Sequence, residues 1–325
     1  MNAAAFEGVV ASLRASRGIA AKADIGLIAE RLGLVGAQIP VGDDCAAIPD
    51  GDGHLLLAIE GFMNEFVAAD PWFAGWCGMM VNLSDIAAMG GRPLAVVDAV
   101  WANGDEVAGQ ILDGLSAAAR AYGVPIVGGH SNLRNAQGQL AVAVLGRAGS
   151  RLLTSFDARP GDALVIACDH RGRYRAPFDN FQAAIEASPE RLRADLALLP
   201  EIAERGLARA AKDISQGGII GTALMLAESS SVAIDVDLDA ILPPTGVEIA
   251  RWLKTFPSYG YLIAVKPADL ETVLTLFRVR DLHAAKIGDI RAGCRVTLIT
   301  AGREALIRDF AEQRLMGLSL EASES

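Results

Sequence analysis

Cysteine, basic charge and long apolar runs are all scarce in this chain, and each shortage excludes a class of protein. The 325 residues include four cysteines with no Cys-x-x-Cys pair, so neither a disulfide framework nor a zinc site is indicated. Lys and Arg number 29 against 39 Asp and Glu, and this net charge of −10 argues against nucleic acids and anionic membranes as partners. No run is long and apolar enough to cross a bilayer, and no basic-then-apolar signal pattern opens the chain. We therefore expect a cytoplasmic protein.

The chain has ample material for a packed interior. Hydrophobic residues make up 52% and charged residues 21%, a composition typical of globular proteins. A length of 325 residues suggests about two domains. Asp157, Pro160 and Gly161 interrupt the pattern in a stretch of mixed polarity. We therefore predict a first domain at 1–150 and a second at 151–325.

The most informative stretch reads VNLSDIAAMGGRP and covers residues 81–93. Apolar residues recur at helical spacing over 75–89, and two glycines followed by a proline suit the end of a helix. Asn82 and Asp85 stand three apart on one face, and no basic residue lies three or four positions from Asp85. Either the two form a solvated polar stripe, or Asp85 faces a metal ion with Asn82 as its polar neighbour. Burying a bare carboxylate would cost several kcal/mol.

A second acidic motif precedes a predicted hairpin. Asp43 and Asp44 are adjacent, and a turn with Pro, Asp and Gly separates them from the apolar run 55–59. The pair can be a turn cap in water or a set of metal ligands. Glu60 follows the apolar run and places a further carboxylate at the end of the second predicted strand.

Elsewhere the pattern predicts alternating helices and strands. The loop 18–22, which carries Lys22, separates helices expected at 6–16 and 24–32. The basic segment 169–178 is either a solvated loop or a receptor for an anionic substrate, because Arg171, Arg173 and Arg175 lie in it. Further expected elements are a short buried strand at 125–127 and helices at 103–121, 189–205, 268–278 and 303–315.

Four motifs in fixed order carry a family resemblance. NLSDIAAMGG, Gly-Asp-Asp-x-Ala-Ala at residues 42–47, Gly-Gly-His at 128–130 and Asp-Ile-Ser-x-Gly-Gly at 213–218 resemble the aminoimidazole ribonucleotide (AIR) synthetase superfamily. Its members include thiamine-monophosphate kinase, selenophosphate synthetase, a hydrogenase-maturation protein and formylglycinamide ribonucleotide amidotransferase. The resemblance implies an α+β, two-domain fold. In it the N-terminal domain pairs into a dimeric β-barrel, and the C-terminal domain is a mixed α/β sandwich.

The resemblance also implies a site for ATP and Mg²⁺. The metal ligands it implies are Asp43, Asp44, Asp85 and Asp213. The nucleotide would be lined by Asn82, Gly128, Gly129, His130, Gly217 and Gly218. The catalytic residues it implies are Asp44 and Lys22, whose loop resembles the Gly-Cys-Gly-Cys-Lys loop of selenophosphate synthetases with Ile19 in place of the first Cys.

The motifs mix branches of the superfamily. The first half resembles the kinases, His130 the selenophosphate synthetases, and Gln216 the amidotransferases. We therefore expect a homodimer that transfers a phosphoryl group from Mg²⁺–ATP to an unidentified small-molecule acceptor, expected to be anionic. One alternative is an ATP-binding or structural subunit without turnover. Within enzymes, the alternative is an activity like that of thiamine-monophosphate kinase or selenophosphate synthetase.

Overall fold

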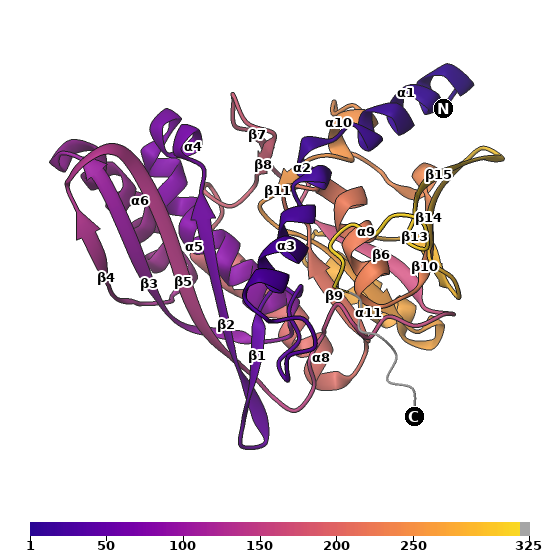
Figure 1. Ribbon diagram of the computed structural model, residues 1–325, viewed down its shortest axis with the longest axis horizontal. Coiled ribbons are helices and arrows are strands. Elements are labelled where there is room, and N and C mark those ends of the chain that lie inside the picture. Colours follow the sequence, from indigo (N-terminus) through magenta and orange to yellow (C-terminus); the bar gives the residue numbers. More distant parts are fainter. Residues whose placement is uncertain (319–325) are drawn as a thin grey trace. The chain divides into compact units, whose positions relative to one another are not determined.

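The computed structural model describes residues 1–318, which fold into two compact units (Figure 1). The first-domain unit comprises residues 44–152 and 186–204. The second-domain unit comprises residues 1–43 and 153–185 and, among the described residues, 205–318. These units differ from the predicted division at residue 150, because residues 1–43 pack with the second domain. None of the helices in the described residues combines the length and apolar character that a bilayer crossing requires.

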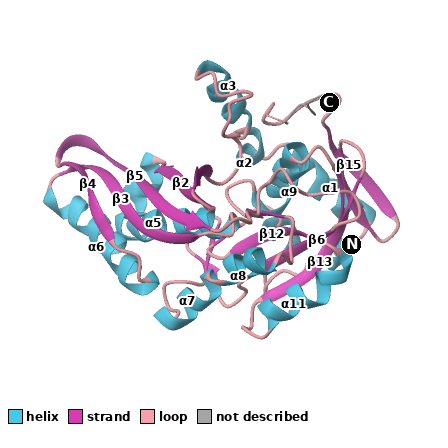
Figure 2. Ribbon diagram, turned by 90° about the horizontal axis from the view of Figure 1, so that it is seen from below, coloured by secondary structure: helices cyan, strands magenta, loops and turns pink. Residues whose placement is uncertain are grey.

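The first-domain unit is a sheet covered by helices. Its order is β1-β2-β5-β3-β4, with β4 parallel to β3 and the other pairs antiparallel. The strands are β1 (Ala46–Asp50), β2 (Gly53–Phe62), β3 (Arg92–Asn103), β4 (Ile126–Asn132) and β5 (Arg134–Ala148). The helices are α4 (Asn64–Ala69), α5 (Pro71–Ala88), α6 (Asp105–Tyr122), α7 (Pro189–Leu196) and α8 (Leu198–Arg205). Helices α5 and α6 lie on one face of the sheet (Figure 2).

Helix α5 is the central element of this unit. It starts at Pro71, four residues before the predicted start, because Asp70 caps it by accepting a hydrogen bond from the Phe73 N–H at 3.1 Å. It ends as predicted, with Gly90 at φ +76°. Nearly all its residues are buried because α6 covers one side and the sheet another.

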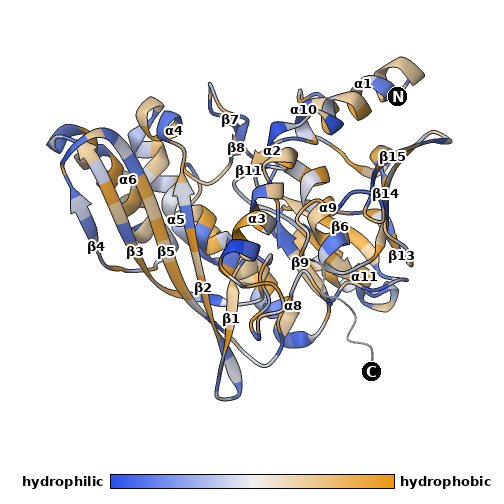
Figure 3. Cartoon of the chain, viewed as in Figure 1, coloured by the Kyte–Doolittle hydropathy of each residue, from blue (hydrophilic) through white to orange (hydrophobic). Residues whose placement is uncertain are grey.

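The opposite face of this sheet is apolar and exposed. Strands β2 and β3 carry hydrophobic stretches along their length (Figure 3). Leu57 and Ile59 on β2 and Val97 on β3 are 47%, 68% and 43% exposed. Strands β2 and β3 are interior strands of this sheet, so their uncovered apolar surface is an outward face and not a sheet edge. The described residues form an open five-stranded sheet in this unit, and its pairing into a dimeric barrel stays a prediction.

The second-domain unit contains a seven-stranded mixed sheet in the order β15-β14-β10-β13-β6-β12-β9. These strands are β6 (Ala163–Cys168), β9 (Ala210–Asp213), β10 (Ala233–Asp237), β12 (Gly260–Val265), β13 (His283–Arg291), β14 (Arg295–Thr300) and β15 (Arg303–Asp309). A small sheet holds β7 (Arg173–Tyr174), β8 (Asn180–Gln182) and β11 (Phe256–Pro257). The helices are α1 (Ala3–Arg14), α2 (Arg17–Ala20), α3 (Ala23–Arg31), α9 (Gly218–Ser229), α10 (Ile249–Trp252) and α11 (Leu270–Arg278), with short 3-10 turns η1 (Leu238–Ala240) and η2 (Pro267–Asp269).

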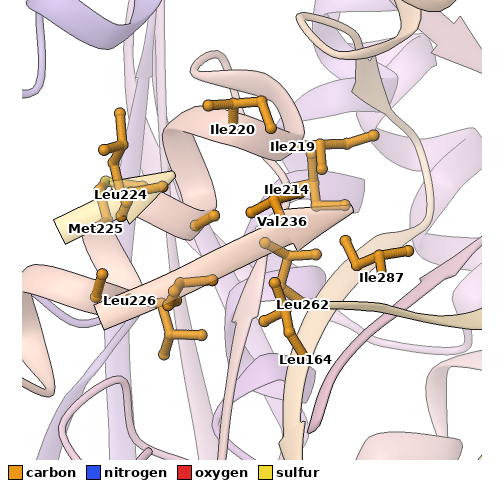
Figure 4. Packing of buried hydrophobic residues seen from close by; sticks show 14 of the residues in the cluster. Leu164, Ile214, Ile219, Ile220, Leu224, Met225, Leu226, Val236, Leu262 and Ile287 are labelled. Carbon is orange, nitrogen blue, oxygen red and sulfur yellow. The ribbon is translucent and has the colours of Figure 1, made fainter. Parts of the chain in front are cut away.

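The core of this unit surrounds α9. Leu224 and Leu226 on α9 lie among residues from several strands, including Leu164 of β6 and Leu262 of β12 (Figure 4). The apolar face of α1 belongs to the same core. That shared burial explains why the N-terminal 43 residues join the second-domain unit.

Three predicted elements differ from the structure. Residues 303–315 were expected as a helix, but 303–309 form strand β15, because they complete a hairpin with β14 through Ala301 and Gly302. The helix expected at 189–205 is two helices, α7 and α8. The short buried strand expected at 125–127 is the longer, largely exposed edge strand β4.

Candidate functional site

Asn82 and Asp85, the two polar residues of α5 that stand out in the sequence, are buried. Asn82 is fully buried and Asp85 is 5% exposed, so the solvated-stripe interpretation is wrong. The Asn82 amide donates a hydrogen bond to the Gly78 carbonyl at 2.8 Å. Its Oδ1 atom is buried and accepts no hydrogen bond from any residue that the structure describes. Asn82 is thus held by its own helix, and its contact with a nucleotide stays a prediction.

Asp44 and Asp85 come together within the first-domain unit. Asp44 lies just before β1 and Asp85 on α5, and a carboxylate oxygen of each lies within 4.8 Å of the other. Oxygens bound to one Mg²⁺ at about 2.0–2.1 Å lie at most ~4.2 Å apart, and Ca²⁺ allows slightly more. Small side-chain movements therefore bring this pair to the spacing of a divalent cation, so the donor set fits Mg²⁺.

Asp43 is oriented by a different partner. Its Oδ2 accepts a hydrogen bond from the Ser155 N–H at 2.8 Å, and its Oδ1 accepts one from the Ser155 hydroxyl at 2.5 Å. Ser155 is itself fully buried. Adjacent aspartates thus have different surroundings, and the role of Asp43 as a metal ligand stays a prediction.

The Gly128–His130 motif forms part of edge strand β4. A side chain at Gly129 would lie 2.8 Å from the Asp98 Oδ2 atom, so only glycine leaves room for that carboxylate. Burial raises the pKa of the Asp98 carboxyl. His130 is exposed, with its ring 6.0 Å from that of Trp101. Our sequence reasoning missed Asp98, although an acid in an otherwise apolar strand was the available signal.

In the second-domain unit, Lys22 meets the Asp-Ile-Ser-x-Gly-Gly motif. The Lys22 ammonium donates a hydrogen bond to the Ser215 hydroxyl at 3.3 Å. Helix α2 approaches the same turn so closely that a Cβ at Gly18 would lie 2.2 Å from the Gln216 carbonyl oxygen. The predicted cation and the predicted anion-binding turn therefore form one structure, although 193 residues separate Lys22 from Ser215.

Gly217 and Gly218 form the N-terminus of α9. Gly218 has φ +65°, and a Cβ there would lie 2.4 Å from the Leu253 carbonyl oxygen, so this position requires glycine. The first N–H groups of a helix favour anions. Asp213 ends the preceding strand, is buried, and its carbonyl accepts a hydrogen bond from Thr222 Oγ1 at 3.3 Å. Asp213 belongs to a different unit from Asp44 and Asp85, and its share in a metal site stays a prediction.

The basic segment after β6 is organised by ion pairs. Arg171 binds Asp169 through two guanidinium nitrogens, at 2.8 and 3.1 Å. Arg251 of α10 stacks on the ring of Tyr174 on β7, at 3.4 Å from its centroid, and also binds Asp179 at 3.0 Å. Arg171 is therefore neutralised locally, so the charge offered to an anion is smaller than the sequence suggests.

Comparison with known proteins defines the family. The model of the AIR synthase related protein N-terminal domain matches residues 42–148, and that of the C-terminal domain matches residues 159–301. The chain belongs to the AIR synthase-related family. An uncharacterised Synechocystis protein is 46% identical over 317 residues, covering 96% of this chain and 98% of the relative. Thiamine-monophosphate kinase of Pyrococcus horikoshii is 33% identical, covering 66% of this chain and 71% of the kinase.

Solved structures share the fold. T. maritima PurL complexed with ADP matches with a TM-score of 0.73 and 19% identity, over 88% of this chain and 48% of PurL. AaThiL complexed with AMPPCP and TMP matches with a TM-score of 0.65 and 20% identity, over 86% of this chain and 92% of AaThiL. These likenesses confirm the two-domain α+β fold that the motifs predicted.

Proposed function

We propose that this protein transfers the γ-phosphoryl group of Mg²⁺–ATP to an anionic small molecule. The pair formed by the half-buried Asp44 and the buried Asp85 carries the proposal, because two carboxylates within 4.8 Å suit a divalent cation. ATP is supported by the family and by solved neighbours that bind ADP and AMPPCP.

In this proposal the acids hold the cation and the loops hold the phosphates. Asp44 and Asp85 would be the principal ligands, and Asp43 and Asp213, acids of the second-domain unit, are proposed to bind Mg²⁺ as well. A bound Mg²⁺ supplies neutralisation of phosphate charge. Asp44 counts as catalytic because phosphoryl transfer depends mostly on positioning and charge stabilisation.

Lys22 would place its ammonium against a phosphate, oriented by its hydrogen bond to Ser215. The backbone N–H groups at Gly217 and Gly218 would bind phosphate oxygens. The remaining proposed nucleotide contacts are Asn82, Gly128, Gly129 and His130.

The acceptor is proposed by analogy with the neighbours. T. maritima PurL is complexed with FGAR in one structure, and AaThiL with TMP. A small anionic acceptor in this chain would be consistent with the arginines of the 169–178 segment. Selenide is disfavoured, because Ile19 stands at the cysteine position of selenophosphate synthetases and is buried.

Phosphorus NMR of the purified protein tests the proposal. The protein is incubated with Mg²⁺–ATP and a panel of phosphorylated and carboxylated small molecules. We expect ADP and a new phosphorus resonance with at least one acceptor, and neither in Asp44→Asn. Nucleotide binding without any turnover across the panel would instead support the ATP-binding subunit.

A further inference from the structure

A cavity in the second-domain unit is distinct from the residues proposed to bind nucleotide. It has a volume of about 330 Å³ and lies between the end of α1, α2, α9 and strand β15. That volume falls within the range of small-molecule sites. Its apolar walls are Leu13, Ile19, Leu224, Leu306 and Ile307.

Two arginines give the cavity its positive charge. The Arg14 guanidinium donates a hydrogen bond to the Leu306 carbonyl, and Arg308 Nη1 donates to the Gln313 and Arg314 carbonyls at 3.4 Å each. Arg308 Nε is buried and makes no hydrogen bond to any described residue. Within residues 1–318, neither arginine forms an ion pair with a carboxylate, so both guanidiniums are available to an anion.

Of the two acids of the cavity wall, Asp309 is engaged by a residue outside the cavity. Asp309 accepts hydrogen bonds from Arg295 Nε at 2.6 Å and from the Ala311 N–H at 3.0 Å. These contacts lower the pKa of the Asp309 carboxyl. Glu312 also acts on Arg295, since both acids raise the pKa of its guanidinium. Because Asp309 is paired with Arg295, which lies outside the cavity lining, the charges left to the cavity are Arg14, Arg308 and Glu312, a net positive charge beside apolar walls.

We propose that this cavity binds an amphipathic organic anion, with its acid group at Arg14 and Arg308 and its apolar body against Leu13, Ile19 and Leu224. A carboxylate or a phosphate ester would satisfy the same guanidiniums, because both accept charge-assisted hydrogen bonds. The apolar body would gain free energy by leaving water.

Fluorescence titration with 8-anilinonaphthalene-1-sulfonate tests the site, because this probe combines an acid group with an aromatic body. N-phenyl-1-naphthylamine serves as the uncharged counterpart. We expect saturable binding of the anionic probe. Arg308→Gln should weaken it by about tenfold, the effect of losing a charged hydrogen bond. Arg308→Lys should restore most of the affinity for the anionic probe. The uncharged probe should bind Arg308→Gln and Arg308→Lys equally well.

Two further variants distinguish probe binding in the cavity from probe binding to other apolar surfaces. Ile307→Trp fills the cavity from a partly exposed position and should abolish binding of both probes there. Arg120→Gln, an exposed arginine of α6, is the matched control and should change nothing. Affinity for the anionic probe that is unchanged in Ile307→Trp and in the Arg14→Gln, Arg308→Gln double variant would overturn the proposal.

Competition identifies the acid group. Octanoate represents a carboxylate, octyl phosphate a phosphate ester, and octanol the uncharged control. We expect at least one of the two anions to displace the probe and octanol to fail. Displacement by octanol as effective as that by both anions would contradict a site for anions.

Discussion

At the scale of single residues, the least expected feature is a pair of stacked histidines. The rings of His170 and His283 lie 4.4 Å apart at 16°, and Trp252 packs edge-on against His170. Burial and the neighbouring His283 lower the pKa of His170 to about 4, although Asp169 opposes the shift. Burial and Arg278 lower the pKa of His283. The pair is therefore neutral in the folded protein at neutral pH.

This pair predicts a loss of stability in mild acid. A histidine with a lowered folded-state pKa contributes stability that is present above its unfolded pKa of ~6.5 and is lost as pH falls toward 4. Because both rings remain partly exposed and solvent screens their charge, we expect the free energy of unfolding, measured in urea, to fall by about 1 kcal/mol between pH 7.5 and 5.0. In His170→Phe, which keeps an aromatic ring, that fall should be smaller. An equal fall in both proteins would contradict the assignment.

At the scale of elements, two glycines of α6 have opposite surroundings. A Cβ at Gly114 would lie 1.9 Å from the Trp72 carbonyl oxygen, where α6 crosses α5. Gly109 on the same helix has nothing within 4 Å of such a Cβ. Close helix contact at Gly114 thus positions α5, the helix that carries Asp85.

The glycine pair gives a matched prediction. Gly114→Ala should destabilise the protein by roughly 1–3 kcal/mol, because the helices must separate. Gly109→Ala should stabilise it by about 0.5–1 kcal/mol, because alanine favours the helix. Urea unfolding of both variants measures this, and effects of the same sign would contradict the packing.

The sequence predicted α5 well because its end signals are local. Glycines, a proline and apolar spacing occur within one stretch, and only the start shifted, to Pro71. Strand β15 could not be predicted in this way, because residues 303–315 carry a helical pattern while pairing with β14 determines the structure. Long-range pairing routinely overrides local propensity.

The site shows the same division. Asp44, Asp85 and Lys22 were predicted from motifs, because each motif is a contiguous string. Ser155, which binds Asp43, and Asp98, which packs against Gly129, were not predicted, since both lie outside those motifs in sequence. Spacing along one helix also left the environment of Asp85 open, and only the packing of α5 showed that it is buried.

At the scale of the whole molecule, the exposed sheet face predicts a homodimer. Leu57, Ile59 and Val97 would remain in water in a monomer, and an apolar face of this kind favours association. Light scattering at micromolar concentration should give twice the chain mass of 34.0 kDa. Ile59→Arg should yield monomer, whereas Val279→Arg, at an exposed apolar site of the other unit, should remain dimeric. A monomeric wild-type protein would exclude the shared barrel.

The central claim is that Asp44 and Asp85 couple Mg²⁺–ATP to the fold. Neighbouring carboxylates repel in the absence of a cation, so Asp85→Asn should leave the free protein as stable as the wild type or slightly more so. At about 100 times the dissociation constant, binding adds roughly 2.7 kcal/mol and raises the melting temperature by several degrees.

Thermal unfolding with and without Mg²⁺–ATP measures that coupling directly. The wild type and Asp113→Asn, a control on α6 outside the acidic pair, should show the full rise in melting temperature. Asp85→Asn should lose most of it. A full wild-type rise in Asp85→Asn would contradict the role assigned to α5 and to its buried carboxylate.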